Sequence, residues 1–137
     1  MASAADKPAR RARPLSPHLQ VYSFLINTVM SIVHRMTGAV LYVGSALIVW
    51  WLAAAAFGPE AYATVAAVFE SIPGRIVLIL YCWALMHHMF GGLRHFVWDT
   101  GHGFDLAMVD KLAWGTLFAS VASTALIVLL AFSGVAG

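Results

Sequence analysis

Residues 76–93 read IVLILYCWALMHHMFGGL, an apolar run between Arg75 and Arg94 that contains no Asp, Glu, Lys or Arg. An α-helix rises about 1.5 Å per residue and the hydrocarbon core of a bilayer is about 30 Å thick, so roughly 20 uncharged residues cross it. His87 and His88 lie inside this run. Ionisable side chains within a span are costly and mark helices that enclose a functional interior. The run therefore predicts a membrane-spanning helix that carries a polar site.

Two further charge-free runs, residues 36–59 and 112–137, flank this one. Asn27 with Thr28, and Pro73 with Gly74, are helix-start signals, so we expect helices over about residues 28–57, 74–98 and 110–135. Residues 58–73, rich in alanine, are expected to form an outer loop. The chain has 137 residues, 61% hydrophobic and 10% charged, which is too little polar surface for a soluble globule. We predict an all-α, integral membrane three-helix bundle.

The distribution of positive charge predicts the orientation of the bundle. Cations gather before the first span and between the second and third, at Lys7, Arg10, Arg11, Arg13, Arg35, Arg94 and Lys111. The positive-inside rule then places the N-terminus in the cytoplasm. Residues 1–26 are expected to form a cytoplasmic tail and connector, and residues 27–137 the membrane anchor. The net charge of +2 reflects this tail and not a nucleic-acid surface. An Arg-rich start is typical of a bacterial tail or of an organellar targeting peptide, so we expect the bacterial inner (cytoplasmic) membrane, with the mitochondrial inner membrane as the alternative.

His88 is the first candidate for chemistry. Tyr81, Leu85, His88, Gly92 and His95 share one stripe of the predicted helix, with Gly91 beside it. A neutral imidazole next to backbone without Cβ atoms is what a haem lying against a helix requires. The alternative is that His88 forms an interhelical hydrogen bond and Gly92 lets two helices approach. His87 points about 100° away and is expected to bond to a neighbouring helix.

Polar residues near the cytoplasmic boundary form the second candidate site. Ser31 and Arg35 share a helix face, and His34 is offset by one position. A hydroxyl and a guanidinium donate hydrogen bonds, which suits a quinone oxygen or a carboxylate. Equally, Arg35 and Arg94 can snorkel to lipid headgroups while Ser31 caps its helix. In the alternative reading, Arg94 and His95 reach acidic groups of a macrocycle bound at His88.

Three motifs resemble the cytochrome b membrane-anchor subunit of succinate dehydrogenase, respiratory complex II. They are RPLSPHL at residues 13–19 with Tyr22, SIVHRMTG at residues 31–38, and HMFGGLRH at residues 88–95 with Asp99. The third is similar to the family's haem-ligand motif H-x-x-x-G-x-R-H-x-x-x-D. Together they cover roughly residues 13–105, in register with three predicted spans, of which the third rests on its apolar sequence alone.

The resemblance implies a role for each candidate residue. His88 would be an axial ligand of the iron of haem b, His34 and His95 would lie near the haem propionates, and Ser31 and Arg35 would bind ubiquinone, with Arg35 also close to the haem. A second small anchor subunit would share the haem and supply the other ligand. The pair would dock an iron-sulfur subunit and a flavoprotein that oxidises succinate. The alternatives are the anchor of a fumarate reductase or, from another class, a small membrane transporter or structural scaffold.

Overall fold

The computed structural model describes residue 21 and residues 23–135. This part of the chain forms four helices: α1 (Ile26–Phe57), α2 (Pro59–Glu70), α3 (Ile72–Asp99) and α4 (Leu106–Val135). Three of them, α1, α3 and α4, are long and apolar enough to cross a membrane. The prediction of an all-α bundle with three spans is confirmed. The predictions for the basic residues of the tail and for the first motif lie outside the described residues.

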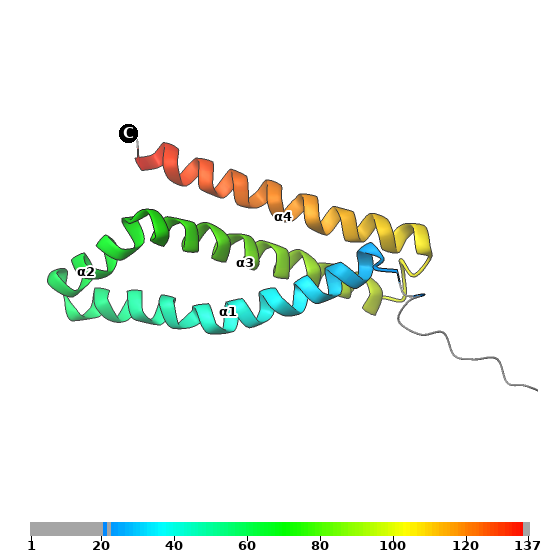
Figure 1. Ribbon diagram of the computed structural model, residues 1–137, viewed down its shortest axis with the longest axis horizontal. Helices are drawn as coiled ribbons and strands as arrows, with labels where there is room; N and C mark the ends of the chain where they lie inside the picture. Colours follow the sequence, from blue (N-terminus) through cyan, green and yellow to red (C-terminus); the bar gives the residue numbers. More distant parts are fainter. Residues whose placement is uncertain (1–20, 22, 136–137) are drawn as a thin grey trace, which may run out of the picture.

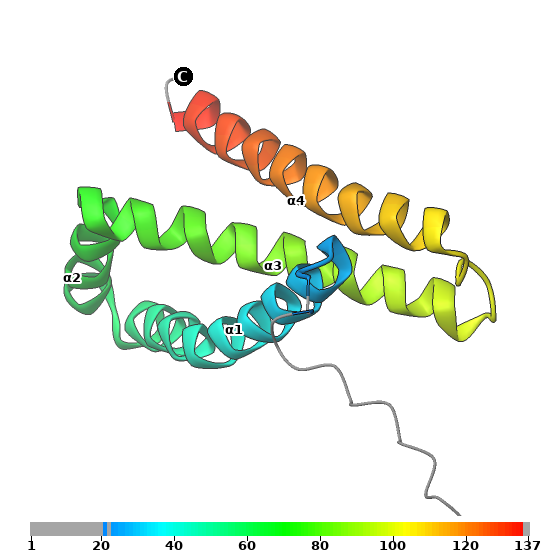
Figure 2. The same ribbon diagram turned by 45° about the vertical axis from the view of Figure 1, so that its right-hand side comes forward.

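Helix α3 lies between α1 and α4 in both ribbon views, and the short α2 joins the far end of α1 to the start of α3 (Figure 1, Figure 2). At the other end, the Asn27 side-chain amide donates a 2.8 Å hydrogen bond to the Asp110 carboxylate and so ties α1 to α4. Asn27 was expected to cap α1, but α1 already begins at Ile26, with Leu25 at the cap position. The expectation was wrong because the amide finds a partner on another helix instead of on its own backbone.

The connection between α1 and α3 also differs from the expectation, because residues 59–70 form a helix and not a loop. Gly58 has a φ of 116°, a backbone conformation that favours glycine, and it turns the chain directly after α1. Pro59 then occupies the first helical position and Glu60 lies in the first turn, where both favour helix formation. Val65 of α2 is buried against the bundle.

Helix α3 begins with a side-chain cap. The Ser71 hydroxyl accepts a 3.2 Å hydrogen bond from the Gly74 backbone N–H, and Pro73 follows within the first turn, where its missing N–H costs nothing. The helix therefore starts two residues before the predicted position, and α4 starts four residues before its predicted position.

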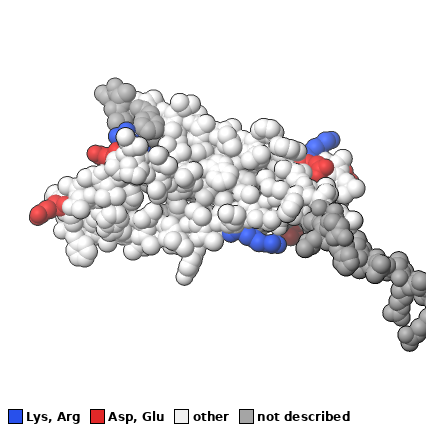
Figure 3. Space-filling model, viewed as in Figure 1, with Lys and Arg blue, Asp and Glu red and all other residues white. Residues whose placement is uncertain are grey.

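The surface of the bundle matches a membrane environment. On the face shown in Figure 3, charged side chains lie near the two ends and, in blue, along the lower edge to the right of the middle, while the rest of the broad central region is uncharged. Large apolar side chains in the middle of the helices are exposed, among them Leu80, Leu93 and Phe118. Apolar surface of this extent is expected to be covered by lipid or by other membrane helices.

Candidate functional site

Helices α1 and α3 pack through two histidines, each of which lies against a glycine of the other helix. The imidazole of His88 on α3 covers Gly38 on α1, where a Cβ atom would approach His88 Cε1 to 3.0 Å. In the reverse sense, the imidazole of His34 on α1 covers Gly91 on α3, where a Cβ atom would overlap the ring. The two rings are stacked, with centroids 4.1 Å apart and planes 3° from parallel. The glycines thus let both imidazoles lie inside the bundle.

Hydrogen bonds orient the His88 ring. Its Nδ1 lies 3.1 Å from the backbone carbonyl oxygen of His34 and 3.4 Å from the Thr37 hydroxyl, which itself donates to the same carbonyl. A carbonyl oxygen only accepts, so Nδ1 carries the proton in this contact. The lone pair then lies on Nε2. A neutral imidazole oriented through Nδ1 is the form that binds a metal through Nε2, so His88 fits an axial haem ligand.

Unpartnered polar atoms surround this histidine pair. Within the described part of the chain, the buried His34 Nδ1 has no hydrogen-bond partner, and neither do Nε and Nη1 of Arg94, whose side chain is only 4% exposed. The Arg94 guanidinium lies 5.1 Å from the Trp98 ring centroid, a cation–π contact. His95 contacts the rings of both His34 and Trp98, at 5.3 and 5.2 Å. A buried arginine without an anion is costly, so these groups suit a carboxylate supplied from outside the chain.

Arg94 therefore does not snorkel toward headgroups within this structure, as its place near the membrane boundary had suggested. Sequence reasoning named it but did not predict that it would be buried. The only local signal was its spacing from His87, seven residues or two turns, which puts both on the face of α3 that packs inside the bundle.

His87 has the structural role expected of it. Its side chain is fully buried, and its Nδ1 lies 3.3 Å from the Ser120 hydroxyl of α4. The centroid of the Trp83 ring lies 5.3 Å from the centroid of the His87 ring. His87 therefore joins α3 to α4, whereas His88 faces α1.

The structure brings together only part of the predicted quinone site. Ser31 and His34 are half-buried on α1, while Arg35, the next residue, is exposed. Arg35 thus does not share the burial of the stacked histidines. Sequence reasoning gave no role to Thr37 and Gly38, although both lie in the quoted SIVHRMTG motif. Their spacing of three and four residues after His34, one helical turn, was the available signal.

Glycine roles on α3 also differ from the expected arrangement. For Gly92, on the stripe of His88, no heavy atom of the described residues lies within 4 Å of the position that a Cβ would occupy. Gly91 is the glycine that allows the close approach of α1. The backbone beside His88 is therefore open at Gly92, as a flat ligand would require, and closed by His34 at Gly91.

Comparison with known proteins gives a consistent result. Residues 9–127 match the family described as succinate dehydrogenase/fumarate reductase transmembrane subunit. The chain is 40% identical over 123 residues to the succinate dehydrogenase cytochrome b556 subunit of Paracoccus denitrificans, covering 90% of this chain and 95% of the relative. It is 35% identical over 115 residues to the b556 subunit of Rickettsia conorii, covering 84% and 90%. The mitochondrial cytochrome b560 subunit of Bos taurus is 30% identical over 117 residues, covering 82% and 68%. These relatives and the matched family model agree with the three spans and the paired histidines described above. The chain belongs to the succinate dehydrogenase/fumarate reductase transmembrane subunit family.

Proposed function

We propose that the chain is the cytochrome b membrane anchor of a succinate dehydrogenase, that His88 is an axial ligand of haem b, and that Ser31 and Arg35 bind ubiquinone. The observation that carries the proposal is the histidine pair: His34 and His88 lie between α1 and α3, each seated on a glycine, with the Nδ1 of His88 hydrogen-bonded and its Nε2 left for a metal. The relatives described above bear succinate dehydrogenase names, so a fumarate reductase anchor is not favoured. They are bacterial and mitochondrial, which agrees with an inner membrane.

The second axial ligand is proposed to come from the other small anchor subunit. His34 and His88 would not hold one haem between them, because their rings are stacked in parallel with centroids only 4.1 Å apart. His34 therefore lies beside His88 and not across a macrocycle from it. His34, with an unpartnered Nδ1, and its neighbour His95 are suited to donate to the acidic groups of the haem.

Bound haem would supply one-electron chemistry within the membrane. The chain's own contribution is to keep His88 neutral and oriented through the His34 carbonyl, and to hold the site between apolar helices. The flavoprotein and iron-sulfur subunits are proposed to deliver electrons to quinone at the cytoplasmic end of the bundle. Recognition of succinate is assigned to the flavoprotein, so this chain has no dicarboxylate site in the proposal.

Ser31 and Arg35 are proposed to act on the quinone itself. Ser31 would donate a hydrogen bond to a quinone oxygen, and Arg35 would stabilise the negative charge that develops there during reduction. Arg35 is exposed in the isolated chain, so it is accessible to a ligand held between this chain and its partner subunits. Its proximity in sequence to His34 also links the two proposed sites.

The test compares Arg35→Lys and Ser31→Ala in the assembled complex. Lysine keeps the charge but lacks the planar guanidinium, so we expect quinone reduction to fall, by about 10²–10³ if the lost group stabilises transition-state charge. Succinate oxidation with a soluble artificial acceptor should continue at the wild-type rate, and the haem spectrum should be recorded alongside. Wild-type quinone turnover in both variants would return Ser31 and Arg35 to capping and lipid contact.

A further inference from the structure

The backbone carbonyl of His34 is shared by donors from two helices. The Thr37 hydroxyl of α1 donates to this oxygen at 2.9 Å, and Nδ1 of His88 on α3 lies 3.1 Å from it. A hydroxyl has one proton, and because the carbonyl receives it, Thr37 does not also donate to His88. The 3.4 Å distance between the hydroxyl oxygen and His88 Nδ1 is longer than an ordinary hydrogen bond. Thr37 and His88 therefore compete for one acceptor.

The surrounding side chains hold this arrangement in place. Thr37 is buried, with 3% of its surface exposed, so water does not replace its hydroxyl as a donor. The His88 ring lies against Gly38 and is stacked on His34. Hydrogen bonds shielded from water in this way are electrostatically stronger than exposed ones. Loss of one donor is therefore expected to change the strength of the remaining hydrogen bond while the ring keeps its position.

We propose that Thr37 is a positioning residue that limits how strongly His88 donates electron density to the haem iron, by competing with His88 for the His34 carbonyl. The inference rests on the proposed function, in which His88 is an axial ligand. Donation from Nδ1–H makes an imidazole a more basic ligand, and a more basic ligand stabilises ferric haem. A carbonyl oxygen that already accepts from a hydroxyl attracts a second proton less strongly. Thr37 thus weakens the hydrogen bond of His88 and raises the reduction potential of the haem.

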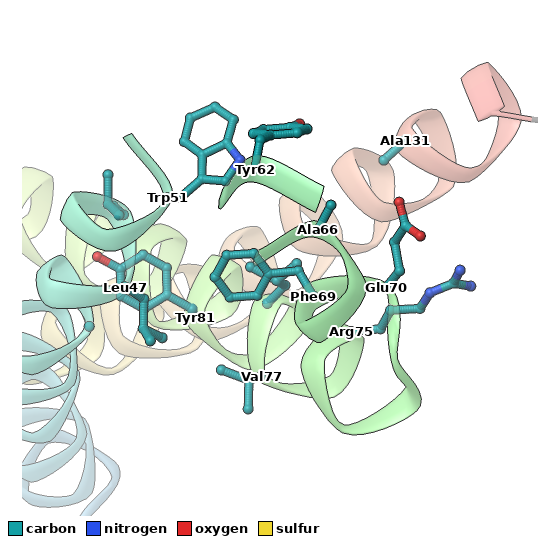
Figure 4. A pocket seen from close by; sticks show the side chains of 13 residues that line it. Leu47, Trp51, Tyr62, Ala66, Phe69, Glu70, Arg75, Val77, Tyr81 and Ala131 are labelled. Carbon is teal, nitrogen blue, oxygen red and sulfur yellow. The ribbon is translucent and has the colours of Figure 1, made fainter. Parts of the chain in front are cut away.

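A second contact between the same two helices provides an internal control. The Tyr81 hydroxyl of α3 donates to the Leu41 carbonyl of α1 at 3.4 Å, and the Tyr81 ring lies against Gly44. Figure 4 shows Tyr81 at the wall of an apolar cavity of about 690 Å³ between α1, α2 and α3. Tyr81 precedes His88 by seven residues, about 10 Å along the helix. This contact also joins an α3 side chain to an α1 carbonyl, but it does not involve His88.

The experiment is a potentiometric titration of the haem in the intact complex, followed by visible absorbance. Thr37→Val keeps the shape of the side chain without its hydroxyl, so the carbonyl is left to His88 and the midpoint should fall. At the wild-type midpoint the ratio of ferric to ferrous haem should rise by about threefold, the order expected for a change in one hydrogen bond. At 59 mV per tenfold for one electron, threefold corresponds to about 28 mV.

Conservative and control variants separate this effect from packing. Thr37→Ser restores a hydroxyl and should keep the wild-type midpoint, while Thr37→Ala should fall as Thr37→Val does and replaces it if the valine variant does not assemble. Tyr81→Phe removes the other hydroxyl between α1 and α3. Thr116→Val removes a buried hydroxyl that donates within α4, to the Leu112 carbonyl at 2.8 Å. Both of these control variants should keep the wild-type midpoint.

The inference is overturned if the variants without the Thr37 hydroxyl have an unchanged or higher midpoint, or if Thr37→Ser or Tyr81→Phe lowers it as much as they do. His88→Ala, recorded in parallel, tests the proposed function separately. Wild-type haem bands in His88→Ala would remove His88 as the ligand and the inference with it. Lost bands in His88→Ala, together with a wild-type midpoint in Thr37→Val, would overturn the inference alone.

Discussion

Gly91→Ala is expected to separate α1 from α3, and the neighbouring Gly92→Ala provides a matched control. A Cβ atom at Gly91 overlaps the His34 ring, whereas one at Gly92 meets no atom of residue 21 or residues 23–135 within 4 Å. His34 has little room to withdraw, because its ring is stacked on His88 and the His88 ring in turn lies against Gly38. The overlap must therefore be relieved by moving the helices apart.

The magnitude follows from two effects. Gly→Ala within a helix stabilises by about 0.5–1 kcal/mol, and both variants gain this equally. Inserting a methyl group into a packed interior costs about 1–3 kcal/mol, and only Gly91→Ala incurs this cost. Gly91→Ala should therefore be less stable than Gly92→Ala by about 1–3 kcal/mol, while Gly92→Ala should equal or exceed the wild type.

The assay is reversible unfolding of the full-length chain in mixed micelles with increasing SDS, followed by circular dichroism. Haem is left out so that any contact between haem and Gly92 does not enter the comparison. Equal stabilities of the two variants, or a Gly91→Ala chain more stable than Gly92→Ala, would refute the packing of His34 on Gly91.

Two other interactions inside the bundle give predictions of opposite sign. Ser120→Ala removes the hydroxyl that pairs with the buried His87, so it should destabilise the chain by about 1–3 kcal/mol in the same titration. The haem spectrum of the complex should not change. Wild-type stability of this variant would show that His87 has another partner. Arg94→Met removes a buried charge that no anion of the described residues pairs with, so it should stabilise the isolated chain by about 1 kcal/mol or more. The same change should lower the yield of assembled complex in gel filtration if a carboxylate from outside the chain pairs with Arg94. Loss of stability in the isolated chain would contradict that reasoning.

The spans could be predicted from sequence because the bilayer imposes a length and excludes charge, as Arg75 and Arg94 at the ends of residues 76–93 illustrate. The helix at residues 59–70 could not be recognised by the same rule, since it is short and outside the charge-free windows. The signals that do predict it are local: Pro59 at the first position, Glu60 in the first turn, and an alanine-rich composition, since alanine has the highest helix propensity.

The candidate site was predicted in part for a similar reason. Helical spacing alone places His87 and His88 on different faces of α3. In the structure His87 lies at the interface with α4 and His88 at the interface with α1. The way α1 crosses α3 decides which of the two glycines, Gly91 or Gly92, lies against α1. That crossing cannot be predicted from the spacing of residues within α3. The burial of Arg94 is likewise a result of tertiary packing, because an arginine near a membrane boundary ordinarily reaches headgroups.

The most direct test of the central assignment is the reduced-minus-oxidised spectrum of intact complexes that carry His88→Ala or His87→Gln. Glutamine at residue 87 preserves a side chain able to hydrogen-bond Ser120, so that variant should assemble and retain the b-type haem bands of the wild type. His88→Ala should lose or strongly alter those bands, because the imidazole that stacks on His34 and is oriented through Nδ1 is removed. Wild-type bands in His88→Ala, with their loss in His87→Gln, would contradict the assignment and move the iron ligand to the face of α3 that packs on α4.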